Sequence, residues 1–155
     1  MSFGFSSRDF TALGQLAWTV YKSCRDAPGS FNSISSEVLS LQAVVKEVEE
    51  TLSGHPLPKS MQASLAVILT GCREVLQDLQ ALIDRYESLG SQSKRTFDRM
   101  GWGMNDIAEL RARLTSNVVM LNTFMRHVPL DYTGRIALLL TRAQHFPGRR
   151  REEAQ

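Results

Sequence analysis

The sequence predicts an all-α protein, an antiparallel four-helix bundle with short additional helices near residues 95–100 and 132–143. Three observations predict this fold. Apolar residues recur at alternating spacings of three and four over long stretches of the chain. Segments rich in Gly and Pro separate these stretches, and no strand-like alternation or hairpin turn competes with them. Because the separating segments are short, consecutive long helices are expected to run antiparallel.

Each predicted helix follows from its apolar spacing. The expected helices span approximately residues 8–26, 31–53, 60–89, 105–128 and 132–143. Ser6 is the expected N-cap of the first helix, and Asn105 or Asp106 that of the fourth. The apolar stripes of the second, third and fourth helices are Phe31, Ile34, Val38, Leu41, Val45, Val48 and Leu52; Met61, Leu65, Ile68, Cys72, Val75, Leu79, Leu82, Tyr86 and Leu89; and Ile107, Leu110, Leu114, Val118, Leu121, Met125 and Val128. Each stripe gives a long helix one apolar face, so these helices must pack on one another.

Three breaker segments separate the long helices. Ala27-Pro28-Gly29 ends the first, residues 54–58 with two prolines end the second, and residues 90–93 follow the third. The same apolar spacing also permits an intermolecular coiled coil, but stripes joined by tight turns favour packing within one chain. Residues 1–145 are therefore expected to form one helical bundle. Residues 146–155 would be a charged tail or a linker to downstream domains.

Length and composition agree with one globular domain. The chain has 155 residues, 43% of them hydrophobic and 22% charged, which allows a core without disulfides or a metal and argues against intrinsic disorder. Cys24 and Cys72 lie 48 positions apart and are interpreted as reduced core thiols of a cytosolic protein. No uncharged apolar stretch reaches the roughly 20 residues of a membrane-spanning helix. The chain is therefore not expected to be an integral membrane protein.

The sequence carries no recognisable catalytic, nucleotide-binding or metal-binding motif. The three histidines, His55, His127 and His145, have no spacing typical of metal ligands, and no phosphate-binding glycine loop occurs. Carboxylate pairs such as Glu49-Glu50 are typical of a solvated helix face rather than of acid–base machinery. We therefore expect neither an enzyme nor a bound cofactor or metal.

The first helix differs from the others in its charge. The stretch Phe10–Tyr21 has no charged residue, and Leu16 and Trp18 widen its apolar face to roughly 200°, beyond the narrow stripe of a surface helix. Two further large apolar residues, Phe3 and Phe5, precede it. Two interpretations stay open: the helix is central and covered by the others, or its face can leave the bundle and enter a membrane or a partner. Twelve uncharged residues make about 18 Å of helix, too short to span a bilayer but long enough for shallow insertion.

Charge is distributed unevenly along the chain. Residues 31–55 have one Lys against four Glu, and residues 94–155 have eleven Lys or Arg against six acids. This polarity could serve pairing between helices, anionic lipid headgroups or nucleic acid. The overall net charge is only +2, and no clustered aromatic residues are interleaved with the basic ones, so nucleic acid is not an expected partner.

Several short segments of the chain carry a family resemblance. They are Met1–Ser6, Asp9–Phe10, Leu16–Ala17, Val20–Tyr21, Cys24, Ala27–Gly29, Phe31, Ser36–Val38, Ser40–Leu41, Val44–Glu47, Lys94–Met100, Gly101–Gly103 and Asp106–Leu114. Over residues 1–128 the chain resembles the HeLo-like N-terminal domain of fungal NLR-like and ankyrin-repeat proteins. Related HeLo cell-death domains are four-helix bundles, and they resemble the animal necroptosis executioner bundle and the coiled-coil domains of plant immune receptors.

The resemblance implies an N-terminal effector or signalling domain of a fungal NLR-like protein. Such a domain would act in heterokaryon incompatibility and innate immunity, inducing programmed cell death by oligomerisation and by membrane targeting through its first helix. Its partners would be other copies of itself, anionic membrane lipids, and downstream NTPase and repeat domains. It would be cytoplasmic and bind the plasma membrane peripherally on activation. The acidic contact motif of the plant domains is not visible at Arg73–Asp78.

The resemblance also implies where contact would occur. The membrane or partner face is expected to consist of Phe3, Phe5, Phe10, Leu13, Leu16, Trp18 and Val20. Headgroup contacts could come from the basic residues Lys94, Arg95 and Arg99. The alternative function is a protein-interaction bundle that mediates dimerisation or partner recruitment without touching a membrane.

Overall fold

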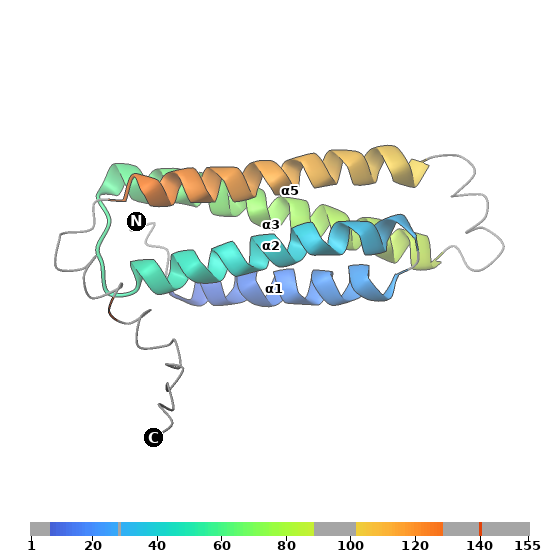
Figure 1. The fold of residues 1–155 in the computed structure, drawn as a ribbon, viewed down its shortest axis with the longest axis horizontal. Helices are drawn as coiled ribbons and strands as arrows, with labels where there is room; N and C mark the ends of the chain where they lie inside the picture. The colour runs from blue at the N-terminus through green and yellow to red at the C-terminus, as the bar shows by residue number, and fades with distance from the viewer. Residues whose placement is uncertain (1–6, 28, 89–101, 129–139, 141–155) are drawn as a thin grey trace, which may run out of the picture.

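The described part of the chain is entirely helical in its regular structure. A computed structural model describes residues 7–27, 29–88, 102–128 and 140. It contains four long α-helices, which are α1 (Ser7–Asp26), α2 (Ser30–Leu52), α3 (Lys59–Ser88) and α5 (Trp102–Arg126). They lie alongside one another, with their axes along the longest dimension of the molecule (Figure 1). No strand occurs in these residues, so the predicted all-α class is confirmed.

The helix bounds agree with the predicted ones except for α5, which begins three residues and ends two residues before the predicted bounds. The first three helices begin and end within one residue of the predicted bounds. The N-cap predicted at Asn105 or Asp106 is wrong, because α5 already begins at Trp102. Gly103 does not prevent this start, since its cost of about 1 kcal/mol in a helix interior is small beside the packing of a long amphipathic helix. Ser6 and the short helices predicted near 95–100 and 132–143 lie outside the described residues, apart from Leu140.

The breakers between the first three helices act as predicted. Gly29 precedes α2 with a φ of 67°, and Gly54 follows α2 with a φ of 76°, backbone conformations that residues with a side chain rarely adopt. At the first connection, the side-chain amide of Asn32 donates a hydrogen bond of 2.9 Å to the carbonyl oxygen of Arg25. This bond satisfies one of the last carbonyl groups of α1 from the first turn of α2.

The four helices form a ring in cross-section. The first helix, α1, packs mainly on α2 and next on α3, and α5 packs on the same two neighbours. The helices α1 and α5 therefore occupy opposite corners, and each helix keeps an outer face. The interpretation that the first helix is central and covered by the others is wrong, because a corner position leaves the Trp18 side chain 44% exposed.

The predicted stripes make up most of the core. All their described members are buried except Leu52, Met61, Ile68, Val118 and Met125, which are half-buried and pack against the core. The stripe pattern missed the burial of Leu69, Leu76 and Ile83 on α3. These residues are buried because α3 packs on both α1 and α5. Packing on two neighbours requires a wider apolar face than one stripe provides.

Two neighbouring leucines on α2 test this account of the core. Leu41 is fully buried, whereas Leu39 is 38% exposed on the outer face. Leu41→Ala should lower the free energy of unfolding by about 2–5 kcal/mol, because it leaves a cavity between helices. Leu39→Ala should change it by about 0.5 kcal/mol or less. Chemical denaturation followed by circular dichroism measures both, and equal losses would contradict the assigned helix faces.

Candidate functional site

The structure divides the predicted membrane face of α1 into a buried and an accessible part. Phe10, Leu13 and Val20 are buried against the neighbouring helices, Leu16 is half-buried, and Trp18 is exposed. In this state most of the face belongs to the core and cannot contact a membrane. The other predicted site residues, which lie outside the described part, are Phe3, Phe5, Lys94, Arg95 and Arg99.

Trp18 lies at the surface beside Tyr21, which is one turn further along α1. Its ring centroid lies 5.3 Å from that of Tyr21, and the Arg25 guanidinium carbon lies 5.8 Å from the Tyr21 ring centroid. The indole borders a shallow hollow of about 540 Å³ between α1 and α2, to which Val45 and Lys46 contribute. An exposed indole with one wet and one apolar side is typical of interfaces with partners or with lipid headgroups.

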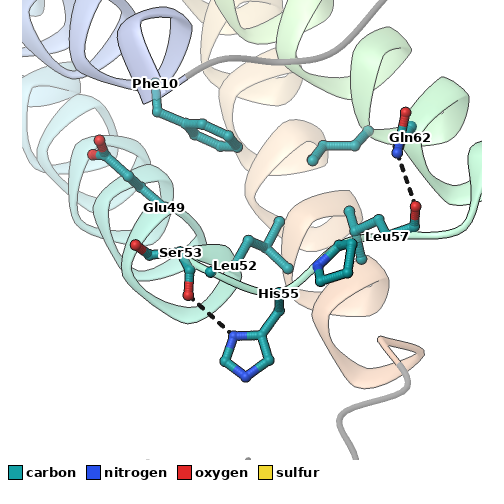
Figure 2. A pocket seen from close by; sticks show the side chains of 10 residues that line it. Phe10, Glu49, Leu52, Ser53, His55, Leu57 and Gln62 are labelled. Carbon is teal, nitrogen blue, oxygen red and sulfur yellow. Dashed lines mark hydrogen bonds between the residues drawn. The ribbon is translucent and has the colours of Figure 1, made fainter.

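A second hollow of about 360 Å³ lies where α1 begins and α2 ends (Figure 2). Phe10 of α1, Leu52 of α2 and Leu57 of the α2–α3 connection project towards one another there. The connection is held in place by the Gln62 side-chain amide, which donates a hydrogen bond of 2.8 Å to the Leu57 carbonyl oxygen. The His55 ring points away from the hollow (Figure 2). Phe10 is thus the contact through which α1 closes this end of the bundle.

A third surface, which sequence reasoning missed, lies between α3 and α5. Its large apolar side chains are unusually exposed: Val67 is 73% exposed, Val119 57% and Met120 42%. Beside them is a hollow of about 420 Å³ lined largely by apolar groups. Met61, Ser64, Ile68, Val119, Met120 and Thr123 line this hollow. Val67 lies one turn after Ser64 and one turn before Gly71, which approaches Asn117 of α5, so it shares their side of α3. We define the α3–α5 face as these six residues and Val67.

A signal for the α3–α5 face is present in the sequence. Neither Ser60–Cys72 nor Leu114–Met125 contains a charged residue, and both are at least as long as the uncharged stretch of α1. The prediction that the first helix differs from the others in this respect is therefore wrong. The fold brings the two stretches together, since a Cβ atom on Gly71 would lie only 3.2 Å from Oδ1 of Asn117. An uncharged, partly apolar surface of this kind is typical of contact with another macromolecule or a membrane.

Two of the basic residues of the C-terminal part serve the bundle itself. Arg111 forms an ion pair of 3.0 Å with Glu37 of α2, and Arg113 one of 2.7 Å with Asp78 of α3. Each pair joins α5 to an adjacent helix of the ring. Exposed pairs of this kind contribute roughly 0–1 kcal/mol, so they favour the correct pairing of helices more than they stabilise the fold. For these two residues, pairing between helices accounts for the positive charge.

The two cysteines are free thiols in the core. Cys24 lies on the buried side of α1, and Cys72 on that of α3. Removal from water raises the pKa of both thiols from the ordinary 9.0 to about 12. Both therefore stay protonated and unreactive near neutral pH while α1 remains docked.

No group of His, Cys, Asp and Glu side chains in the described residues could hold a metal ion, and no helix among them is long and apolar enough to cross a bilayer. Comparison of the chain with protein-family models, with curated proteins and with solved structures found no match. A function has therefore to be inferred from the bundle and its surfaces.

The buried thiols predict slow chemical modification. At pH 8 Cys24 and Cys72 should react with a disulfide reagent at least about a hundredfold more slowly than in the unfolded chain. The free energy of unfolding should also fall as the pH rises from 9 towards 12, because the unfolded thiols ionise there and the folded ones do not. The single variants Cys24→Ser and Cys72→Ser assign each rate. A fast reaction of either thiol in the native protein would contradict its burial.

Proposed function

We propose that the chain is a HeLo-like N-terminal effector domain of a fungal NLR-like protein, which induces regulated cell death by oligomerisation and membrane targeting through α1. The observation that carries this proposal is the uncharged stretch Phe10–Tyr21 on a helix at a corner of the bundle. Its apolar side chains are docked on two neighbours, and Trp18 is already at the surface. The domain would be cytoplasmic, with NTPase and repeat domains downstream, and would bind anionic lipids of the plasma membrane on activation.

We also infer that consecutive helices run antiparallel. Thr11, near the start of α1, donates a hydrogen bond of 3.2 Å to the carboxylate of Glu49, near the end of α2. The rings of Phe31, near the start of α2, and Tyr86, near the end of α3, lie 5.1 Å apart. Both contacts, and the short connections at residues 27–29 and 53–58, support this arrangement of α1, α2 and α3. It would place the first turns of α1 at the end of the bundle where α2 meets α3.

Release of α1 has a large free-energy cost in the isolated bundle. Burial of a Phe, Leu or Val side chain contributes about 1.5–3 kcal/mol, so Phe10, Leu13 and Val20 together hold α1 with about 5–9 kcal/mol. Fewer than about one molecule in a thousand would then have α1 released. The domain would be inactive until another interaction offsets this cost.

A membrane surface can supply that interaction. A released α1 would lie in the headgroup region, where its apolar side chains are again removed from water. Its uncharged stretch of about 18 Å suits this position, because no charged group has to enter the acyl region. The Trp18 indole is of the type that gathers at the membrane–water interface.

A second candidate function is favoured by the α3–α5 face. A protein-interaction bundle that dimerises or recruits a partner would need exposed apolar side chains on the folded domain, such as Val67, Val119 and Met120. It would not need α1 to leave the core. Flotation with anionic vesicles separates the two functions, because only the effector binds lipid.

Charged substitutions on α1 test the membrane step. Trp18→Glu and Leu16→Glu should each reduce leakage from phosphatidylserine-containing vesicles at least about tenfold, because a carboxylate resists entry into the acyl region. In this assay, copies of the protein would be brought together by a fused oligomerisation domain that a small molecule induces. Leu39→Glu is the matched control and should leave leakage unchanged, since Leu39 is exposed on α2, outside the uncharged stretch of α1. Unchanged leakage with both variants, or no leakage by the wild type after induction, would refute the proposal.

The buried Cys24 thiol reports directly on α1. In a Cys72→Ser variant, an impermeant maleimide should label Cys24 slowly in solution and at least about tenfold faster once oligomers and vesicles are present, because docking is what protects this thiol. Mass spectrometry of the labelled protein measures the rate. Leakage without faster labelling would show that α1 stays docked and that another surface perturbs the membrane.

A further inference from the structure

We propose that the α3–α5 face binds a second copy of the chain, with a two-fold axis perpendicular to the helices at the level of Val67. The proposal names the surface used in the self-association that the proposed function includes, and its role in signalling rests on that function. The dimer itself can be measured without lipid. The starting observation is the exposure of Val67, Val119 and Met120 on two adjacent helices of a folded bundle.

The absence of charge makes this face compatible with itself. In a two-fold contact the same surface occurs on both subunits, so a charge near the axis meets its own copy. Neither Ser60–Cys72 nor Leu114–Met125 has a charged residue, and the centre of the contact would be free of such repulsion. By contrast, the exposed side of α2 has Lys46, Glu47 and Glu50 within one and a half turns.

The net charges at the two ends of the face have opposite sign. Lys59 and Arg126 lie at the end marked by Met61 and His127, which line one hollow. Towards the other end lie three acids, Glu74, Asp106 and Glu109, and one base, Arg73, so the net charge there is negative. All six side chains are exposed. Lys59 and Glu74 are 15 positions apart, about 22 Å along α3, and Val67 lies midway.

The two-fold axis therefore pairs unlike charges. Rotation about an axis at Val67 exchanges the two ends of α3, which brings Lys59 of each copy to the level of Glu74 of the other. A like-directed arrangement would instead place Lys59 beside Lys59. This complementarity selects a second, oppositely directed copy over a neutral apolar partner.

The size of the face sets the expected strength of the dimer. An uncharged stretch of 12 or 13 residues is about 18–20 Å long, and neighbouring helix axes lie about 8–10 Å apart. Such a face is smaller than the roughly 800 Å² per partner of a standard stable interface. We expect a reversible dimer with a Kd in the micromolar range.

Sedimentation velocity over a concentration series up to hundreds of micromolar tests the face. Val67→Glu and Met120→Glu should each weaken the dimer at least about tenfold, because each places two carboxylates near the axis. Leu39→Glu is the matched control on the exposed side of α2 and should leave the Kd unchanged. A wild type that stays monomeric throughout, or a dimer that survives both substitutions, would overturn the proposal.

A charge exchange tests the two-fold arrangement. Glu74→Lys should weaken the dimer, and adding Lys59→Glu to it should restore the Kd to within about threefold of the wild type, because the unlike pairs re-form with reversed signs. Loss without restoration would overturn the assigned axis. The proposal would also be overturned if the wild type stays monomeric, floats with vesicles, and loses this lipid binding on Val67→Glu. The face would then bind lipid and not a second copy.

The same variants keep this inference apart from the proposed function. Trp18→Glu lies outside the α3–α5 face and should leave the dimer intact while reducing leakage. The Val67→Glu protein should no longer dimerise by itself. It should still cause vesicle leakage when the fused oligomerisation domain is induced. If the wild type dimerises but causes no leakage after induction, only the membrane function is refuted.

Discussion

The docking of α1 on α2 and α3 is the interaction on which the structure and the proposed function both depend. Phe10, Leu13 and Val20 close the core at this corner, and Phe10 also closes the end of the bundle beside the α2–α3 connection. The same side chains would have to enter a membrane. A side chain buried in the core cannot contact lipid at the same time, so the stability of the folded bundle and the proposed membrane activity would oppose each other. Under the proposed function, the bundle would be inactive because it is well packed.

The ring of helices keeps the two candidate surfaces apart. Because α1 and α5 occupy opposite corners, the Trp18 side of α1 faces α2, whereas the α3–α5 face lies across the ring. A dimer formed through Val67 and Met120 would therefore leave Trp18 accessible. Self-association with α1 still docked and membrane contact with α1 released can follow one another without competing for the same residues.

Most of the fold could be predicted from the sequence because helix periodicity and breakers are local. The start of α5 could not, because the packing of a long helix outweighed the local signals of Gly103 and Asn105. The candidate site was only partly predictable. The uncharged stretch Phe10–Tyr21 of α1 is visible in the sequence, but the corner position of α1 depends on which helices pair. Val67 and Val119 lie 52 positions apart, so their common face exists only in the folded bundle.

Dimerisation through the α3–α5 face cannot by itself release α1. An interaction shifts a conformational equilibrium only if it favours one state over the other, and this face is the same whether α1 is docked or free. The driving force has to come from an interaction made only by the released helix, such as burial of Phe10 and Leu13 in a membrane surface. The dimer contributes differently: it holds two copies of α1 on one particle, so that the insertion of one helix raises the effective concentration of the second at the membrane. Release is then driven by lipid, and the second copy makes that lipid contact persist.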